Sequence, residues 1–251
     1  MHKILGIIVL FMLVLPLSFS QTKTNKNVTK KIPVTTSSVN YNDNVPIVSS
    51  EKKLAEIRVK ISTDLGDIIV RLSNKTPKHR DNFVKLVNEH FYDSLLFHRV
   101  IKNFMIQAGS PSSKNAAPGI FVGGGDVGYT IPAELDSSLY HKRGSLAAAR
   151  NNNPDKASSG CQFYIVQGKI MNNSELDIIE KENGIYFSSA KRMTYKMIGG
   201  TPVLDMNYTV FGEVESGMEV VDKIAVTQTD GNSRPLSDIK MKMEVMKEEI
   251  K

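Results

Sequence analysis

Apolar and polar residues alternate near both ends of the segment 57–245, a pattern typical of strands with one buried face. Every second residue of 57–61 is apolar, turn residues follow at 64–67, and 68–72 resumes the strand pattern, so the segment predicts an opening β-hairpin. Residues 239–245 alternate in the same way at the other end. The pattern therefore predicts a mainly β domain whose chain begins and ends in strands.

One segment after the hairpin has the spacing of a helix that covers a sheet. Thr76 and Pro77 predict an N-cap and a first-turn proline. The apolar stripe of residues 83–87 continues to His90, which we interpret as a packed histidine rather than a ligand. We expect this helix to cover one open end of the sheet.

A second capping helix is predicted near the end of the chain. Ser216 and Glu219 have the spacing of a capping box ahead of the apolar positions in 220–225, and strand character over 203–213 precedes them. Strands at both ends and two widely separated helices predict a closed β-barrel whose first and last strands pair.

Residues 169–201 have a different character from the rest of the domain. Ser174 and Asp177 suggest a helix cap, residues 183–184 (Asn-Gly) a stop, and 189–198 another short helix. We interpret this segment as an insertion of two short helices, and we expect it to border the substrate groove and influence selectivity.

The middle of the chain contains a loop and two further strand patterns. Residues 110–128 are rich in Gly and Pro, but Gly123–Gly125 is not followed by Lys-Ser/Thr or by a helix pattern, which argues against a phosphate loop. Residues 147–149 are three alanines that would leave a shallow floor for another backbone, and 162–166 is rich in β-forming residues.

Composition and charge exclude several classes of protein. A chain of 251 residues that is 41% hydrophobic can bury one sizeable core, so one domain with extensions is expected. Residues 1–56 hold seven Lys and three acidic residues, which leaves only +2 of the net charge of +6 for the rest. No clustered basic face is visible in the domain, so nucleic-acid binding is not expected.

The number of cysteines excludes two kinds of structural cross-link. Cys161 is the only cysteine, so an intrachain disulfide and a Cys-based zinc site are both excluded. We predict that this thiol is a small buried hydrophobe rather than a reactive group.

The first 56 residues predict export and a tether. Residues 1–20 combine His2 and Lys3 with an apolar run over 4–17 and small residues at the end, which is typical of a cleaved secretory signal. An uncleaved anchor is the alternative, although this run is shorter than the roughly 20 residues that span a bilayer. Residues 21–56 are poor in aromatic residues and predict a flexible linker. We expect a location in the periplasm or cell envelope.

The segment 97–109, FHRVIKNFMIQAG, contains the most distinctive candidate chemistry. It holds no Asp, Glu or Ser that could act as acid, base or nucleophile, so it is typical of a pocket floor rather than of a hydrolytic centre. The guanidinium of Arg99, a permanent cation, and the amide of Gln107 are the candidate site groups, whereas His98 is expected to be a packed structural residue.

Three sequence blocks together resemble the cyclophilin-type peptidyl-prolyl cis-trans isomerases. They are FHRVIKNFMIQAGSP from Phe97, GSLAAAR from Gly144 with SSGCQFYIV from Ser158, and LDMNYTVFGEV from Leu204. The resemblance covers 57–248 apart from the insertion. It implies a closed eight-stranded antiparallel β-barrel capped by two α-helices, with the domain at 57–251.

The resemblance also implies the site residues. Arg99 would be the catalytic cation and Gln107 would orient the substrate backbone. The substrate-binding residues it implies are Phe104, Met105, Ala149, Gln162, Tyr164, Leu204 and Tyr208. It implies no metal and no other cofactor. The partners of the protein would be proline-containing polypeptides that are unfolded or partly folded, and the protein would act as a monomer.

This sequence departs from the family pattern at four positions. Tyr164 stands where Phe is common, Arg150 where many members have Asn, and Tyr208 where many have His. Val203 occupies the position of an indole that contacts cyclosporin in some members, so sensitivity to that drug does not follow from the resemblance.

The residue types suit rotation about an X–Pro bond. Amide resonance gives this rotation a barrier of about 18–20 kcal/mol, and no bond is made or broken, so no nucleophile is needed. A donor such as Arg99, aimed at the prolyl nitrogen, acts mainly when resonance is lost. Two alternatives are a chaperone-like binder of proline segments with little catalysis and a lipocalin-like barrel, but the bulky residues of these strands would fill a hollow interior.

Overall fold

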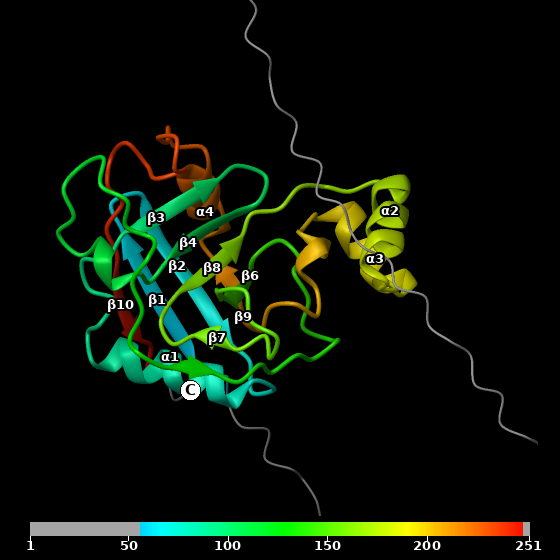
Figure 1. Ribbon diagram of the computed structural model, residues 1–251, viewed down its shortest axis with the longest axis horizontal. Coiled ribbons are helices and arrows are strands. Elements are labelled where there is room, and N and C mark those ends of the chain that lie inside the picture. Colours follow the sequence, from blue (N-terminus) through cyan, green and yellow to red (C-terminus); the bar gives the residue numbers. More distant parts are fainter. Residues whose placement is uncertain (1–55, 248–251) are drawn as a thin grey trace, which may run out of the picture. The chain divides into compact units, whose positions relative to one another are not determined.

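An eight-stranded antiparallel sheet organises the residues that the computed structural model describes, 56–247 (Figure 1). The strand order is β10-β1-β2-β9-β6-β8-β4-β3. The strands of this sheet are β1 (Arg58–Thr63), β2 (Gly66–Leu72), β3 (Phe97–Ile101), β4 (Met105–Ala108), β6 (Ser145–Ala148), β8 (Phe163–Val166), β9 (Val210–Ser216) and β10 (Lys242–Val245). A separate two-stranded sheet pairs β5 (Thr130–Ile131) with β7 (Ser158–Ser159).

Four α-helices accompany the sheet within residues 56–247. They are α1 (Pro77–Asn88), α2 (Asn173–Asn183), α3 (Ser189–Met197) and α4 (Met218–Ala225), with short 3₁₀ turns at Pro111–Ser113 and Pro202–Leu204. None of these helices is long and apolar enough to cross a membrane. The predicted signal at 1–20 and the linker up to residue 55 lie outside the described residues.

The opening hairpin and the pairing of the first and last strands are confirmed. β1 and β2 pair with Ile61 opposite Ile68, and β10 pairs with β1 with Met243 opposite Ile61. Gly66 allows the tight turn with a left-handed φ of 129°. The terminal strand itself is shorter than the alternating segment 239–245.

The prediction of a closed barrel is wrong, because the sheet is open between β3 and β10. β3 and β10 do not pair with each other; the segments beside them are joined only by the isolated bridge between Leu96 and Lys240 and a few backbone hydrogen bonds, such as that from the amide of Phe97 to the Ile239 carbonyl at 3.0 Å. Further along β3 the amide of Val100 donates to the carbonyl of Ser233, 2.8 Å away, in the loop before β10. Ser233 has a left-handed φ of 65°, so this loop cannot extend the ladder, and the sheet is a half-barrel.

The beginning of α1 is capped from a distance rather than by Thr76. Pro77 is the first helical residue as predicted, but the Thr76 hydroxyl makes no capping hydrogen bond. The amides of Lys78 and His79 instead donate to the Glu134 carboxylate, each at 3.0 Å. An acceptor 55 residues away has replaced the local cap.

The end of α1 corrects the interpretation of His90. The buried residues of α1 are His79, Phe83, Leu86 and Val87, so His79 is the histidine on the apolar stripe. His90 follows the helix with a left-handed φ of 56°, and its side chain is 71% exposed. The stripe cannot reach position 90 because the helix has already ended at Asn88.

The capping box predicted for α4 is also wrong. Ser216 is the last residue of β9, and the helix starts after Gly217, which has a left-handed φ of 88°. A Cβ atom at Gly217 would lie 2.3 Å from the carbonyl oxygen of Asp67, so this close approach decides where the helix begins. The strand predicted over 203–213 is likewise displaced, since β9 covers only Val210–Ser216.

The insertion contains two helices as predicted, and in Figure 1 α2 and α3 lie together. The capping box of α2 is formed by Asn172 and Glu175 rather than by Ser174 and Asp177. Gly184, in a left-handed conformation, ends α2 where the stop was expected.

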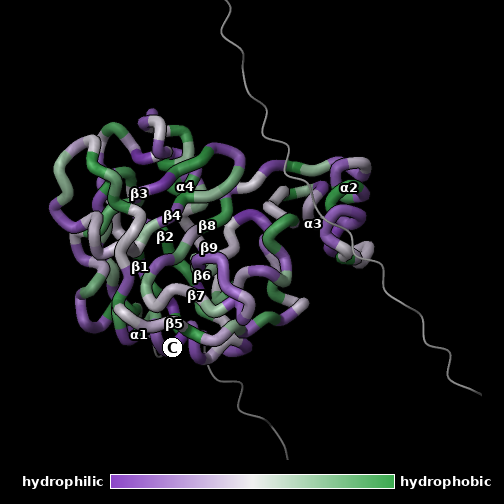
Figure 2. Tube along the Cα trace, in the orientation of Figure 1, coloured by the Kyte–Doolittle hydropathy of each residue, from purple (hydrophilic) through white to green (hydrophobic). Residues whose placement is uncertain are grey.

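The apolar residues form three clusters, and Figure 2 shows hydrophobic stretches along the central strands and α4. The main core lies between the sheet and helices α1 and α4, and contains Phe83, Phe97, Phe163 and Phe211. A second cluster covers the opposite face of β4, β6 and β8, and a third lies within the insertion. The second cluster borders the candidate site.

Candidate substrate site

Strand alternation creates the wall of the site on β4 and β8. In β4, Ile106 and Ala108 join the main core, whereas Met105 belongs to the second cluster on the other face. In β8, Ile165 faces the core and Tyr164 the second cluster. This is the period-two pattern of a strand whose two faces have different neighbours.

A β-bulge at His98 sets the direction of Arg99. Phe97 pairs with Ala108 and Arg99 with Gln107, so β3 has one more residue than β4 between these pairs. Without the extra residue, Phe97 and Arg99 would point to the same face of the sheet. With it, Phe97 is fully buried in the core while Arg99 lines the site beside Gln107.

The predicted site residues converge on one cavity of about 140 Å³. Its lining residues are Arg99, Phe104, Met105, Gln107, Ala149, Arg150, Tyr164, Leu204 and Tyr208. Eight of the nine predicted residues are therefore together, although they come from four separate stretches of chain. Gln162, the ninth, lies directly behind this cavity, because its side-chain oxygen accepts a hydrogen bond from Gln107 at 3.1 Å.

A chain of hydrogen bonds fixes the polar side of the cavity. Arg99 Nη1 donates to Gln107 Oε1 at 3.2 Å, and Gln107 Nε2 donates to Gln162 Oε1. Gln162 Nε2 in turn donates to the carbonyls of Gly125 at 2.7 Å and Gly123 at 3.2 Å. The glycine-rich loop therefore holds Gln162 in place. Within residues 56–247 no carboxylate forms an ion pair with Arg99, so no carboxylate there competes for its remaining donors.

Two residues near Tyr208 shape the far wall. The Arg150 guanidinium lies over the Tyr208 ring, 4.7 Å from its centroid, and Arg150 Nε donates to the Asn207 carbonyl at 2.8 Å. The Tyr208 ring in turn meets the Tyr164 ring edge-on, with centroids 6.0 Å apart. In the sequence, Arg150 was notable only because it departs from the family pattern. Its place in the cavity wall depends on its stacking against the Tyr208 ring.

His98 is a buried support, as predicted. It is 4% exposed, and neither ring nitrogen has a hydrogen-bond partner in the described part of the chain. Burial, assisted by the neighbouring charge of Arg99, lowers the pKa of His98 to about 4. The ring is therefore neutral near pH 7 and unsuited to proton transfer there.

Cys161 is buried next to Gln162, which confirms the prediction of a buried thiol. Burial raises the pKa of Cys161 to about 12, so the reactive thiolate is scarce. Among residues 56–247, no cluster of His, Cys, Asp and Glu could hold a metal ion.

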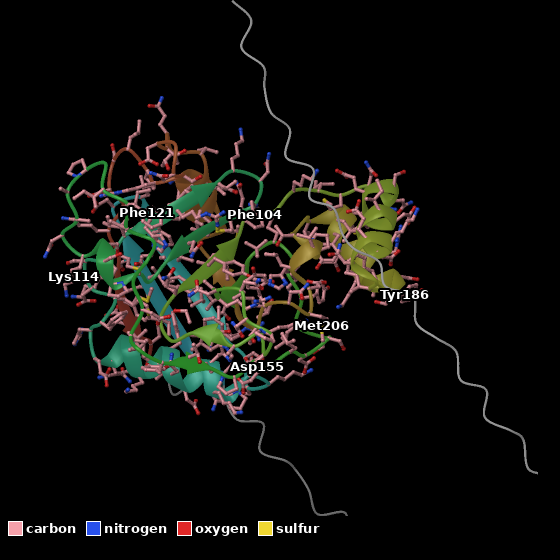
Figure 3. The ribbon with its side chains drawn as sticks, in the orientation of Figure 1. Phe104, Lys114, Phe121, Asp155, Tyr186 and Met206 are labelled. Atoms are coloured by element: carbon pink, nitrogen blue, oxygen red, sulfur yellow. The ribbon has the colours of Figure 1, made fainter. Side chains whose placement is uncertain are left out.

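A second cavity, of about 240 Å³, adjoins Arg99 and Gln107 on the other side. Its outer wall comes from the loop around Phe121, which is 69% exposed and is labelled with Phe104 in Figure 3. Buried Arg234 holds this loop by donating to the Ile120 carbonyl at 2.7 Å and the Ala117 carbonyl at 2.9 Å. Sequence reasoning missed this wall because the loop and Arg234 lie more than a hundred residues apart and show no shared pattern.

Comparison with known proteins agrees with this arrangement. The family model for cyclophilin type peptidyl-prolyl cis-trans isomerase/CLD matches residues 58–245. A putative peptidyl-prolyl cis-trans isomerase of Staphylococcus aureus (strain USA300) is 32% identical over 197 residues, which cover 78% of this chain and 94% of that protein.

A second relative is much longer than the chain. This putative bifunctional phosphatase/peptidyl-prolyl cis-trans isomerase of Streptococcus pyogenes serotype M6 is 35% identical over 189 residues. The match covers 72% of this chain but only 37% of that protein, so the chain spans little more than a third of its length.

Solved structures show the same fold. A cyclophilin type peptidyl-prolyl cis-trans isomerase of Cryptosporidium parvum superimposes with a TM-score of 0.56 at 22% identity, covering 77% of this chain and 99% of the other. A crystal structure of the same protein in the presence of the dipeptide Ala-Pro has a TM-score of 0.55 at 23% identity, covering 76% and 99%.

Proposed function

Because the chain belongs to the cyclophilin-type peptidyl-prolyl cis-trans isomerase family and is an isomerase of that class, we propose how and where it acts. It accelerates rotation about X–Pro bonds in exported polypeptides that are unfolded or partly folded. Arg99 stabilises the transition state, the apolar cavity holds the proline ring, and Gln107 holds the backbone on one side of the bond.

The chemical reason lies in the prolyl nitrogen. In the planar ground state its lone pair is delocalised into the carbonyl, and it becomes available as an acceptor only when the bond is twisted. The guanidinium of Arg99 keeps its charge and offers directional N–H donors. A hydrogen bond formed mainly in the twisted state lowers the barrier without tightening the ground-state complex to the same degree.

The observation that carries the proposal is the meeting of an unpaired cation and an apolar cavity. Arg99 has no carboxylate partner among residues 56–247, and it lies at the edge of a cavity whose other walls include Phe104, Met105 and Leu204. Its two observed contacts, with Gln107 Oε1 at 3.2 Å and Met105 Sδ at 3.9 Å, orient it along this wall. Such a cation is held in position before any substrate arrives.

The substrate class follows from the size and polarity of this cavity. A cavity of about 140 Å³ with one apolar wall, beside a hydrogen-bonded amide, suits a small ring followed by extended backbone. The related Cryptosporidium protein was crystallised in the presence of Ala-Pro, which supports proline-containing peptides as ligands here. We take the acting form to be a monomer.

Export is the second part of the proposal, and it rests on the composition of residues 1–56. The apolar run of 4–17 would direct secretion, and cleavage before Gln21 would release a domain on a flexible linker into the periplasm or cell envelope. Sequencing the N-terminus of protein recovered from the envelope fraction tests this, and a mature chain that starts at Met1 would contradict cleavage.

The isomerase proposal is tested with a protease-coupled assay on an X–Pro peptide. We expect Arg99→Ala to lower kcat/KM about 100-fold or more, as when one transition-state donor is removed elsewhere. Arg99→Lys should recover only part of the loss because a point charge replaces a directional fork. Arg58→Ala, which removes an arginine from β1 outside the cavity, is the matched control and should match the wild type.

Equal activity in wild type and Arg99→Ala would refute the proposed role of Arg99. The assay also separates catalysis from simple binding. If Arg99→Ala lost isomerisation but still suppressed aggregation of an unfolded protein, binding of proline-containing segments would be a property independent of catalysis.

A further inference from the structure

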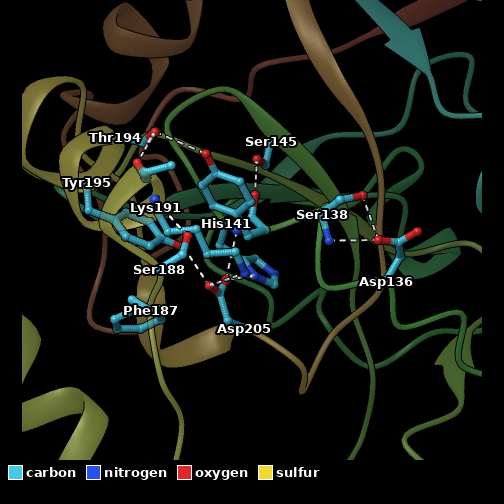
Figure 4. A network of polar contacts seen from close by, with 12 residues as sticks. Asp136, Ser138, His141, Ser145, Phe187, Ser188, Lys191, Thr194, Tyr195 and Asp205 are labelled. Atoms are coloured by element: carbon cyan, nitrogen blue, oxygen red, sulfur yellow. Dashed lines mark hydrogen bonds and ion pairs between the residues drawn. The ribbon is translucent and has the colours of Figure 1, made fainter.

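A buried chain of polar contacts connects the helical insertion with the proline-binding cavity. Figure 4 shows the part of it around Tyr195, Asp205 and His141. Tyr195, on α3, donates its hydroxyl to Asp205 Oδ2 at 2.8 Å. Asp205 Oδ1 lies 3.0 Å from His141 Nδ1 and accepts the His141 backbone amide at 2.9 Å. His141 Nε2 lies 2.9 Å from the hydroxyl of Tyr164, which lines the cavity.

All four residues of this hydrogen-bonded chain are buried. Tyr195 and His141 are fully buried, Asp205 is 3% exposed and Tyr164 is 4% exposed. Burial raises the pKa of both tyrosines, and the carboxylate of Asp205 adds to this effect, so both remain hydroxyl donors. Polar groups that are buried and mutually satisfied hold one geometry, because breaking any link leaves an unpaired group without water.

The direction of the hydrogen bonds follows from the carboxylate. Asp205 can only accept, so Tyr195 and the Nδ1–H of His141 both donate to it. The last link joins His141 Nε2 and the Tyr164 hydroxyl, which lie 2.9 Å apart. The Tyr164 hydroxyl is thereby held at His141, while Tyr164 also lines the cavity.

The chain touches the cavity at two points and the insertion at two others. Tyr164 and Leu204, the residue before Asp205, both line the cavity. On the insertion, the Tyr195 ring packs against Phe187 in the third cluster, and Lys191 Nζ lies 3.9 Å from Asp205 Oδ2. The insertion is therefore anchored to the cavity wall through these buried contacts.

We infer that the α2–α3 insertion is a buttress of the proline pocket, and that Tyr195, Asp205 and His141 are positioning residues which fix the Tyr164 ring and Leu204. This inference rests on the proposed function, because it assumes that the cavity holds the substrate proline. It also makes the expected influence of the insertion on selectivity specific. The insertion acts through the shape of the wall and does not need to contact the substrate.

Three conservative variants test the inference. Tyr195→Phe and Tyr164→Phe each remove one hydroxyl from the chain and keep the ring. Tyr140→Phe is the matched control, because its hydroxyl also binds α3, at Thr194 Oγ1 with a distance of 3.1 Å, but is not part of the chain. All three are compared in the full chain for kcat and KM on an X–Pro peptide and for the Kd of an Ala-Pro peptide.

We expect Tyr195→Phe to raise KM and Kd about three- to tenfold while kcat stays within about twofold of the wild type, because uniform binding of the ring is lost. Tyr164→Phe should have a similar effect. In the double variant the effect should be smaller than the product of the two single effects, since both changes break the same chain. Tyr140→Phe should keep the wild-type KM.

Two results would overturn the inference. The first is a Tyr195→Phe variant with wild-type KM and Kd, whether or not its melting temperature falls, since the hydroxyl would then serve stability alone. The second is a double variant whose effect equals the product of the single effects. Failure of the proposed function would look different, because the wild type itself would not accelerate isomerisation, or Arg99→Ala would be as active as the wild type.

Discussion

The His98 ring is buried beside Arg99, and a proton on it would create a second buried charge next to the first. The pKa of His98 is lowered from 6.5 to about 4, mainly by burial and to a smaller degree by the charge of Arg99. In the unfolded chain the ring regains its ordinary pKa near 6.5. Between these two values the unfolded state binds a proton that the folded state does not, so the free energy of unfolding decreases as the pH falls.

The size of the effect follows from the two pKa values. Each pKa unit corresponds to about 1.36 kcal/mol, so His98 alone should remove about 3 kcal/mol of stability between about pH 6.5 and about pH 4. This loss would be a large part of the total stability of an ordinary domain. The variant His98→Phe keeps a planar buried ring and removes the titration.

The assay is urea unfolding followed by far-UV circular dichroism, since the chain has no Trp. The unfolding free energy of His98→Phe should decrease less on acidification than that of the wild type, by about 3 kcal/mol over the whole window. Other acid-sensitive groups, including buried His79, are present in both proteins and cancel in the comparison.

Parallel curves for His98→Phe and the wild type would refute the reasoning. They would mean that His98 accepts a proton equally well in the folded and unfolded states, which contradicts its burial without a partner.

Two further predictions concern the neighbourhood of Cys161. Gly109→Ala should destabilise the fold by at least about 2 kcal/mol in urea unfolding, because Gly109 has a left-handed φ of 91° and a Cβ would lie 2.3 Å from the Cys161 carbonyl oxygen. Gly119→Ala has a similar φ of 77° but nothing within 4 Å, so an equal loss there would show that the clash is unimportant. The Cys161 thiol, with its pKa raised to about 12, should react with an alkylating reagent at pH 8 far more slowly in the folded protein than in urea, and equal rates would contradict its burial.

The opening hairpin could be predicted because it depends on local periodicity, whereas the cavity residues were implied by the resemblance of three sequence blocks to a known family. The alternation in β1 and β2 determines which side chains face the core, whatever the neighbouring strands are. The combination of a permanent cation, Phe104 and Met105 within one short segment already suggested a pocket without a nucleophile. Their meeting in one cavity agrees with that interpretation.

The errors occurred where a distant residue replaced a local partner. Thr76 had the right position for a cap, but the first amides of α1 donate to the Glu134 carboxylate instead. Ser216 had the right spacing for a capping box, but the approach of Asp67 demanded glycine at 217. Local motifs compete with tertiary contacts, and a single sequence does not show which of them is stronger.

By itself, then, the sequence determined the strand pattern, the buried thiol and the chemical character of the site. Only the tertiary structure decided that a bulge at His98 turns Arg99 toward the cavity, that the sheet remains open beside Ser233, and that Tyr195 is joined to Tyr164. The physical reason is range. Periodicity and residue type are properties of neighbouring positions, whereas register, edge pairing and buried hydrogen bonds depend on which remote segments the packed chain brings within about 3 Å.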